Sequence, residues 1–299
     1  MNLELAWGRL RRRYLRRFRP SYVQQMLEKR AGRCDNCPHD IIDQRDLKFF
    51  RNVCGYRFPD EVDLFRKPSR TRLARAGRAE VVSFSLVLGV LAILCGLAAG
   101  LVHLIFLAPL DVVLVLWLFV ISFFRDPERS IPTDPNALVS PADGTITHIE
   151  EVDEPDFPSG RAFRISIFLS VFNVHVNRAP RTARVLDVRY FPGAFLDARH
   201  RECPVRNEQL WLDLEEPSSQ RLVRVKQISG AIARRIVCWL RPGEEVATGQ
   251  RFGMIKFGSR TEVLLPTGEA MEVRAKIGDK VKGGSSVLLT FTKPQQALS

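Results

Sequence analysis

A stretch of 27 residues without Asp, Glu, Lys or Arg, residues 81–107, most constrains how this chain can fold. As a helix rising about 1.5 Å per residue, it is long enough to cross a hydrocarbon layer of roughly 30 Å. Pro109 and Asp111 interrupt the pattern before a second apolar run, residues 112–124. Arginines flank the pair on both sides, which by the positive-inside rule places both flanks in the cytoplasm. We therefore predict a helical membrane hairpin over residues 81–124, complete or re-entrant, with a buried hairpin in a soluble protein as the alternative.

The charge is spread unevenly and divides the chain into three parts. Residues 1–80 carry 20 Lys/Arg against 10 Asp/Glu, residues 81–124 carry one charged side chain, and residues 125–299 are close to neutral. A basic extension with aromatic residues beside a membrane hairpin suits anionic lipid headgroups. RNA binding is the rival interpretation, since arginine and aromatic residues also suit nucleic acid. We favour lipid and expect no nucleic acid partner.

The cysteines are too few for a disulfide framework, at six in 299 residues. Residues 1–20 lack the apolar core of a secretory signal, so we expect reduced thiols. Within the basic extension, Cys34 and Cys37 have His39 and Cys54 nearby, and these are ligand types for tetrahedral zinc. The second CxxC of a paired knuckle is missing. A zinc site and a small structural module with reduced thiols both remain open.

Residues 125–299 alternate between apolar and polar side chains, as β-strands do. The alternating segments are residues 144–152, 161–169, 183–191, 208–215, 221–228, 260–266 and 286–292. Strands and helices do not alternate, and neither GxGxxG nor GxxxxGK[ST] occurs, which argues against a nucleotide-binding parallel sheet. We therefore predict a mainly β (α+β) catalytic domain, an antiparallel sandwich or barrel-like body behind the N-terminal helical hairpin.

Three positions in this body are candidates for chemistry. Asp143 lies in a turn before a strand, and His175 follows an apolar strand and could act as a general base near neutral pH. Ser259 follows Gly258 between two strand-like segments, where a serine can be a nucleophile. Each also has a structural interpretation, as a turn residue or a hydrogen-bonded histidine. A GxSxG motif is absent from the sequence, so an α/β-hydrolase triad is not expected.

Six segments, taken in order, resemble the phosphatidylserine decarboxylases of the short bacterial type, whose relatives include archaetidylserine decarboxylases. They are FFRDPERSIP (123–132), SPADGTI (140–146), FLSVFNVHVNRAP (168–180), NEQ (207–209), QISGAIARRIV (227–237) and FGSRTEVLLP (257–266). The resemblance covers about residues 75–299 and leaves the role of residues 1–75 open.

The resemblance implies a proenzyme that cleaves itself between Gly258 and Ser259 into residues 1–258, the beta chain, and residues 259–299, the alpha chain. The Ser259 hydroxyl attacks the Gly258 carbonyl, and the serine becomes a pyruvoyl group that forms a Schiff base with the substrate amine. The two chains would form a heterodimer, with a higher oligomer left open.

The implied reaction converts phosphatidylserine in the membrane to phosphatidylethanolamine and CO2, at the cytoplasmic face of the cell membrane. Decarboxylation of another serine lipid, such as archaetidylserine, is the alternative within this class. A non-catalytic membrane scaffold is the alternative from another class.

The base for self-cleavage is where this chain departs from the family pattern. We predict His175, oriented by Asp143. Longer family members carry a second histidine three residues further on, where this chain has Arg178, so His148 or Asp143 stays an alternative base. Candidates for binding the lipid phosphate, the substrate carboxylate or the rest of the headgroup are Arg178, Arg260, Asn177 and Asn207.

The C-terminal residues 276–289 resemble the GDxVxxG hairpins of lipoyl and biotinyl carrier domains. No lysine occupies a carrier-type turn there. We expect lipoyl-like hairpins that are structural rather than a cofactor arm.

Overall fold

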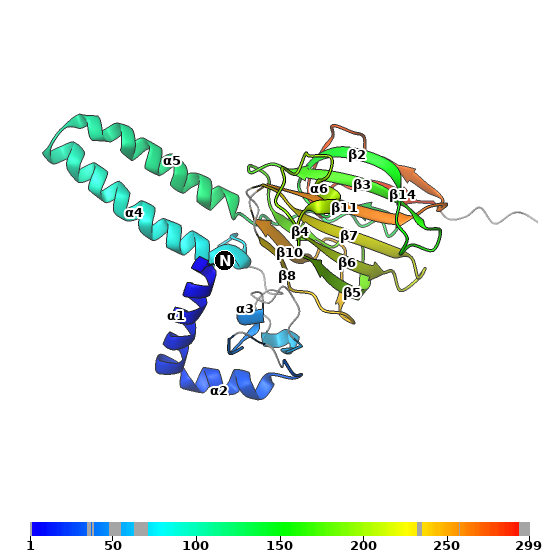
Figure 1. The fold of residues 1–299 in the computed structure, drawn as a ribbon, viewed down its shortest axis with the longest axis horizontal. Helices are drawn as coiled ribbons and strands as arrows, with labels where there is room; N and C mark the ends of the chain where they lie inside the picture. Colours follow the sequence, from blue (N-terminus) through cyan, green and yellow to red (C-terminus); the bar gives the residue numbers. More distant parts are fainter. Residues whose placement is uncertain are drawn as a thin grey trace, which may run out of the picture.

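The computed structural model describes residues 2–34, 37, 39–47, 55–62, 71–231, 235–256 and 258–292. Three parts follow one another along the chain in Figure 1: a helical N-terminal part, a pair of long helices, and a body built of β-strands. Every strand pairing in the body is antiparallel among the described residues. The predicted fold class, a mainly β body behind an N-terminal helical hairpin, is confirmed.

The two long helices are α4 (Arg78–Leu101) and α5 (Leu107–Phe123), which run side by side and project from the body (Figure 1). The short helix η4 (Leu104–Phe106) lies in the connection between them. The most apolar 18-residue windows of the two helices are 0% and 6% buried. By length and composition both helices can cross a membrane.

The turn between these helices lies earlier than the sequence predicts. We expected a break at Pro109 and Asp111, but both residues lie inside α5, and the chain turns at Val102 and His103. Pro109 fits there because the first turn of a helix has no internal partner for its backbone N–H groups. The second apolar helix is therefore not too short to span.

The main sheet has eight strands in the order β13-β2-β3-β11-β7-β6-β5-β9. Their bounds are β13 (Lys280–Val281), β2 (Gly144–Asp153), β3 (Arg161–Leu169), β11 (Ser259–Pro266), β7 (Leu222–Ser229), β6 (Gln209–Glu215), β5 (Ala183–Phe191) and β9 (Glu245–Val246). Six of the seven segments predicted from alternation form the six central strands of this sheet, and β13 and β9 are the short strands at its edges.

Two three-stranded sheets complete the body, in the orders β4-β10-β8 and β1-β14-β12. Their bounds are β4 (Val176–Arg178), β10 (Arg251–Lys256), β8 (Arg235–Cys238), β1 (Ala137–Val139), β14 (Val287–Phe291) and β12 (Met271–Val273). A single turn of helix, α6 (Cys203–Arg206), lies between β5 and β6. The lipoyl-like segment 276–289 supplies β13, which pairs with β2, and the start of β14, which pairs with β1 and β12.

The main sheet has one apolar face and one ionic face, because side chains alternate along each strand. On the inner face, Ile165, Val263, Val225 and Leu212 form a cross-strand row, and all four are 0% exposed. This row lies in the main hydrophobic core, which joins the sheet to the smaller strands. Burying such side chains is the main source of the body's stability.

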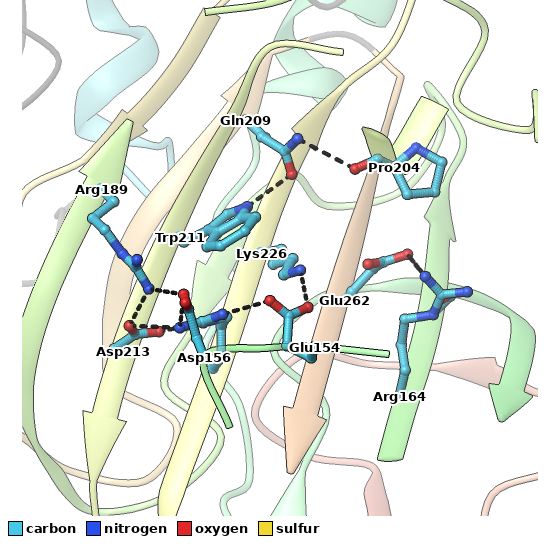
Figure 2. Close-up of polar contacts among 12 residues, drawn as sticks. Glu154, Asp156, Arg164, Arg189, Pro204, Gln209, Trp211, Asp213, Lys226 and Glu262 are labelled. Carbon is cyan, nitrogen blue, oxygen red and sulfur yellow. Dashed lines mark hydrogen bonds and ion pairs between the residues drawn. The ribbon is translucent and has the colours of Figure 1, made fainter. Parts of the chain in front are cut away.

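On the outer face, charged side chains surround Trp211, as Figure 2 shows. Arg224 donates to Asp213 at 2.6 Å and to Glu154 at 2.7 Å, and Lys226 donates to Glu154 at 2.5 Å. The Lys226 ammonium also lies 4.0 Å from the centre of the Trp211 ring. Burial lowers the pKa of Lys226, while its bond to Glu154 opposes that change. The charges on this face are therefore buried in pairs.

The N-terminal part comprises the helices α1 (Asn2–Phe18), α2 (Pro20–Lys29), α3 (Gln44–Leu47), η2 (Asp60–Val62) and η3 (Arg75–Gly77). Ion pairs hold it together: Arg11 contacts Asp43 at 2.8 Å, and Arg12 contacts Asp46 at 3.1 Å. Burial alone would raise the pKa of Asp43, but Arg45 and Arg11 lower it to about 2. Many of the basic residues here thus stabilise the fold.

The cysteines of this part differ from the prediction. Cys34 and Cys37 form a disulfide, so the expectation of reduced thiols is wrong for this pair. Cys54 lies outside the described residues. Within the described ranges, no group of three or more His, Cys, Asp or Glu side chains could hold a metal ion. The predicted zinc site at Cys34, Cys37, His39 and Cys54 therefore has no support.

Candidate active site

The Gly258–Ser259 bond lies where the chain enters β11, in the centre of the main sheet. Ser259 pairs with Leu169 of β3 on one side and with Ser229 of β7 on the other. Gly258 has φ +60°, in the left-handed region that favours glycine. A Cβ added there would meet only Val171, at 3.9 Å. Backbone conformation, rather than lack of space, therefore explains the glycine.

The Ser259 hydroxyl is buried without a hydrogen bond. The residue is 0% exposed, and among the described residues none lies within hydrogen-bonding range of its Oγ. Leaving a buried polar atom unpaired costs about 1–3 kcal/mol, so native folds rarely leave one. An unbonded serine hydroxyl beside a left-handed glycine is a feature that calls for a chemical explanation.

His175 directly precedes strand β4, and its imidazole contacts the backbone of Gly258. Its Nε2 lies 3.3 Å from the backbone N of Gly258, and its Nδ1 lies 3.0 Å from the carbonyl oxygen of Asn173. A carbonyl only accepts and a backbone N–H only donates. Nδ1 therefore carries the proton, and the lone pair of Nε2 accepts from the backbone N–H of Gly258, the residue before Ser259.

The environment of His175 keeps its ring neutral. The residue is 0% exposed, and its ring packs on that of Phe123 with centroids 4.4 Å apart. Burial, with a smaller contribution from the charge of Arg125, lowers the pKa of His175 to about 4, although the bond to Asn173 raises it. A neutral imidazole at pH 7 is the form that can accept a proton.

The carboxylate of Asp143 forms hydrogen bonds with residues other than His175 and Ser259. Its carboxylate accepts from Arg129 at 2.9 and 2.7 Å and from the backbone N–H of Gly283 at 2.8 Å. Both ring nitrogens of His175 already have backbone partners, as described above. The structure thus brings His175 to the Gly258–Ser259 bond and gives the predicted orienter, Asp143, other partners.

The two candidate arginines are buried and bonded within the protein. Arg178 donates to the carbonyl oxygen of Gly249 at 3.0 Å and contacts Asp126 at 3.2 Å. Arg260 donates to Glu262 at 2.8 Å and to the Ser166 hydroxyl at 2.9 Å. Burial lowers the pKa of Arg178 to about 10, so it is still a cation at neutral pH.

The two candidate asparagines are bonded in the same way. Asn177 accepts from Gln227 at 2.7 Å and donates to Thr261 at 3.3 Å, which joins β4, β7 and β11 beneath the bond. Asn207 donates to the carbonyl oxygen of Ser229 at 2.7 Å. It also accepts from the backbone N–H of Leu196 at 2.9 Å, so it holds the loop before α6 against the sheet. The alternative base His148 lies in β2, where its Nδ1 contacts Thr147 at 3.0 Å.

A cleft of about 330 Å³ opens over the bond. Its lining residues are Phe168, Ser170, Val171, Asp197, Ala198, Arg199, Ala231 and Gly258. Asp197 and Arg199 form an ion pair at 2.8 Å on its wall, and their side chains are 49% and 70% exposed. Sequence reasoning missed both residues, because they lie in an irregular loop without a motif. The cleft offers both signs of charge to a ligand beside Gly258.

Comparison with known proteins decides the family. The sequence model of phosphatidylserine decarboxylase matches residues 116–289. The phosphatidylserine decarboxylase proenzyme of Rhodopirellula baltica is 43% identical over 247 residues, 82% of this chain and 99% of that protein. The chain belongs to the phosphatidylserine decarboxylase family. The proenzymes of Desulfotalea psychrophila and Nitrosomonas eutropha are each 48% identical, over 57% and 60% of this chain and 78% and 82% of theirs.

Membership of the phosphatidylserine decarboxylase family makes the chain a pyruvoyl-dependent carboxy-lyase, and it implies a pyruvoyl group as cofactor. The residues present fit such a group. Ser259 has a buried hydroxyl with no partner among the described residues, Gly258 has a left-handed backbone, and a neutral His175 presents Nε2 to the bond between them. The sequence resemblance to this family is thereby confirmed.

Proposed function

We propose that this protein cleaves itself between Gly258 and Ser259 and then decarboxylates phosphatidylserine to phosphatidylethanolamine at a membrane surface. One observation carries the proposal: a buried Ser259 hydroxyl with no partner in the described part of the chain follows a left-handed Gly258 whose backbone N lies 3.3 Å from the Nε2 of His175. The relatives' names supply the substrate, and the cleft over Gly258 supplies the space for a headgroup.

Self-cleavage begins when the Ser259 oxygen attacks the Gly258 carbonyl carbon. His175 takes the hydroxyl proton as the C–O bond forms and returns it to the Ser259 nitrogen as the C–N bond breaks, so the amide becomes an ester with a free amine. Removal of the serine α-proton then expels the Gly258 carboxylate and leaves a dehydroalanine. Water converts that group to a ketone and releases ammonia, so the products are residues 1–258 and a pyruvoyl-blocked chain that begins at position 259.

The two chains stay together because of where β11 lies. The new chain begins with β11, which pairs with β3 along one edge and β7 along the other. Both of these neighbours belong to the larger chain. We therefore propose a heterodimer of the two chains.

The pyruvoyl group, once formed, supplies an electron sink for the carboxylate's departing electron pair. Around it, His175 is placed to return a proton to the substrate carbon. Asp197 and Arg199 lie on the cleft wall, where a carboxylate can bind the serine ammonium and a guanidinium the phosphate. Arg178, Arg260, Asn177 and Asn207 hold the site's strands and loop through the bonds already described, and we propose for them a supporting role.

We further propose that α4 and α5 insert into the membrane, with the body on the cytoplasmic face. The exposed apolar surface of the hairpin and its flanking arginines support this. Phe172 is 73% exposed and packs edge-on against Phe119 of α5 with ring centroids 6.0 Å apart. Its neighbour Val171 lines the cleft. The cleft thus opens beside the hairpin, where a lipid headgroup can enter from the membrane surface.

In this proposal the chain has three units: a basic extension, residues 1–80, a membrane hairpin, residues 81–124, and a catalytic body, residues 125–299. The basic surface of the first unit is available to anionic headgroups near the membrane. We do not assign it a nucleic acid partner.

Intact mass spectrometry of the detergent-extracted protein tests the proposal. We expect two chains that meet at Gly258–Ser259, the smaller one carrying a carbonyl that reacts with hydroxylamine. Ser259→Ala should give one uncut chain without decarboxylase activity on phosphatidylserine vesicles. Ser229→Ala is the matched control, since Ser229 lies directly across on β7 and also has a buried hydroxyl without a described partner.

The control should be cut and active like the wild type. A folded wild-type chain of full length would overturn the proposal and favour a scaffold. A cut protein that acts only on a different serine lipid would correct the substrate and leave self-cleavage standing.

A further inference from the structure

We propose that Phe123, the last residue of α5, is a positioning residue for self-cleavage: its ring holds His175 against the Gly258–Ser259 bond. The root of the membrane hairpin is then part of the processing site. This inference rests on the proposed function. It concerns how the base is placed, which neither the family nor the sequence motifs assign.

The contact between the rings is direct and buried. Phe123 is 1% exposed, and its ring meets that of His175 at a centroid distance of 4.4 Å and an interplanar angle of 35°. Both flanking residues of His175, Val174 and Val176, lie in the same apolar cluster as Phe123. An imidazole enclosed in this way has few other rotamers, so its Nε2 stays directed at the backbone of Gly258.

The hairpin also holds the loop that fixes the tautomer of His175. The carbonyl oxygen of Asn173 accepts from Nδ1 of His175. The preceding residue, Phe172, makes two contacts with residues at the end of the hairpin. Phe119 packs edge-on against the Phe172 ring at 6.0 Å, and the Arg125 guanidinium donates to the Phe172 carbonyl at 2.6 Å. One helix end therefore contacts both the imidazole and the loop that orients it.

The other side of the bond is anchored to the first helix of the hairpin. Glu80, in the first turn of α4, forms an ion pair with Lys256, and their side chains are 8% and 5% exposed. Lys256 ends β10, two residues before Gly258. The preceding residue, Ile255, donates its backbone N–H to the carbonyl oxygen of His175 at 3.2 Å. Thus α4 holds the segment that leads into the bond, and α5 holds the base.

The Phe123 ring also excludes water from His175, and this gives the proposal a specific signature. Burial is the largest cause of the low pKa of His175. The charge of Arg125, in the segment after α5, also lowers this pKa. The charged groups described above on α4 and β10, Glu80 and Lys256, are paired with each other. Replacing the ring with a smaller side chain admits water, so the pKa of His175 rises toward its ordinary value near 6.5.

Cell-free synthesis of the full chain into anionic phospholipid nanodiscs, with pulse labelling, measures the rate of cleavage at each pH. We expect Phe123→Leu to be cut at least about tenfold more slowly than wild type, because small misplacements of a catalytic group have large effects on rate. The pH below which cleavage fails should also move upward. Phe123→Tyr keeps an aromatic face and should restore most of the rate and the wild-type pH profile.

Phe157→Leu is the matched control, because Phe157 is 3% exposed in a separate apolar cluster with Ala162 and Leu264. It should lose stability without a change in the pH profile. The midpoint of the pH profile does not depend on how much chain folds, so it stays informative if leucine lowers the yield.

A Phe123→Leu chain with the wild-type rate and profile would overturn the inference, as would an equal upward shift in Phe157→Leu. In either case a cut wild-type chain leaves the proposed function intact. A wild-type chain that is not cut would overturn both.

Discussion

At the start of β11, the polar side chains on its two faces differ in their hydrogen bonding. On the outer face, Arg260 and Glu262 bond to each other and to Ser166, next to the paired charges around Trp211. On the inner face, the first residue of the same strand, Ser259, has a hydroxyl with no partner among the described residues. Ser229, directly across on β7, likewise has a buried hydroxyl with no partner among the described residues. Of these two hydroxyls, that of Ser259 directly follows the left-handed Gly258, and in the proposed function it is kept unpaired for reaction rather than for stability.

Among the variants that test this comparison, His175→Gln should have the largest effect, and that effect is on the rate of self-cleavage. Glutamine keeps a polar side chain of similar length but cannot act as a base, so self-cleavage should slow by about 10²–10⁴-fold. The measurement is the appearance of residues 1–258 on a gel over time after synthesis. His148→Gln, the same change in β2, should be cut at the wild-type rate. If the two variants exchanged these outcomes, His148 would be the base.

On the ionic face, Arg224→Met should act on stability and leave cleavage alone. Arg224 is 1% exposed, and its loss leaves Asp213 and Glu154 without their shared cation. Glu154 keeps Lys226 and Asp213 keeps Arg189, so the cost in the free energy of unfolding should stay below the roughly 3–5 kcal/mol of a fully unpaired buried charge. Denaturant unfolding in detergent measures it, with Arg206→Met as the exposed control, expected below about 1 kcal/mol. If a folded Arg224→Met chain were cleaved slowly, the ionic face would also contribute to self-cleavage, and the comparison between the faces would fail.

The pH dependence of stability should report His175 separately. Its pKa falls from 6.5 to about 4 on folding, so the unfolded chain binds the proton more tightly. The stability contributed by a neutral His175 is therefore complete above pH 6.5 and is lost as pH falls from 6.5 to 4, by about 3 kcal/mol.

Unfolding of the uncut Ser259→Ala chain at pH 7 and pH 4.5, with and without His175→Gln, isolates this contribution. The loss of stability at low pH should be smaller in the double variant. An equal loss in both chains would show that the histidine is not buried in its neutral form.

The smallest expected effect comes from a substitution at Gly258, whose backbone is left-handed. Gly258→Ala forces an L-residue into a left-handed conformation, which costs about 1–2 kcal/mol. Gly268→Ala is the matched control, because Gly268 has φ +84° with open space around its Cβ position. Both variants should lose similar stability by denaturant unfolding, but only Gly258→Ala should also be cut more slowly. Equal cleavage rates would mean that the left-handed conformation serves the turn and not the reaction.

Much of the fold could be predicted because local patterns decide it. Strands such as β3 and β5 match the alternating segments residue for residue, since one face of each is buried. The hairpin was predicted from its lack of charge, although its turn was misplaced because Pro109 was treated as a break. The Cys34–Cys37 disulfide was missed, because a CxxC spacing suits a metal, a disulfide or free thiols equally well.

Less of the candidate active site than of the fold could be predicted from the sequence. Ser259 and His175 were found through motifs, but the partners of a side chain depend on which loops meet in space. Asp143 bonds to Arg129 and Gly283, and the latter is 140 residues away along the chain. The pair Asp197 and Arg199 lies in a loop with no periodicity, and the Phe123–His175 contact joins the apolar helix α5 to a strand end. No local pattern encodes such contacts.

The central place of β11 has a consequence for how the amount of active enzyme is set. A strand that is bonded on both edges cannot be exchanged without unfolding the sheet around it. If the cofactor arises from Ser259 inside this sheet, it can be neither loaded from outside nor replaced after damage. Each molecule then has one active site for its lifetime, made from its own backbone, and a cell can raise or renew the activity only by synthesising new chains.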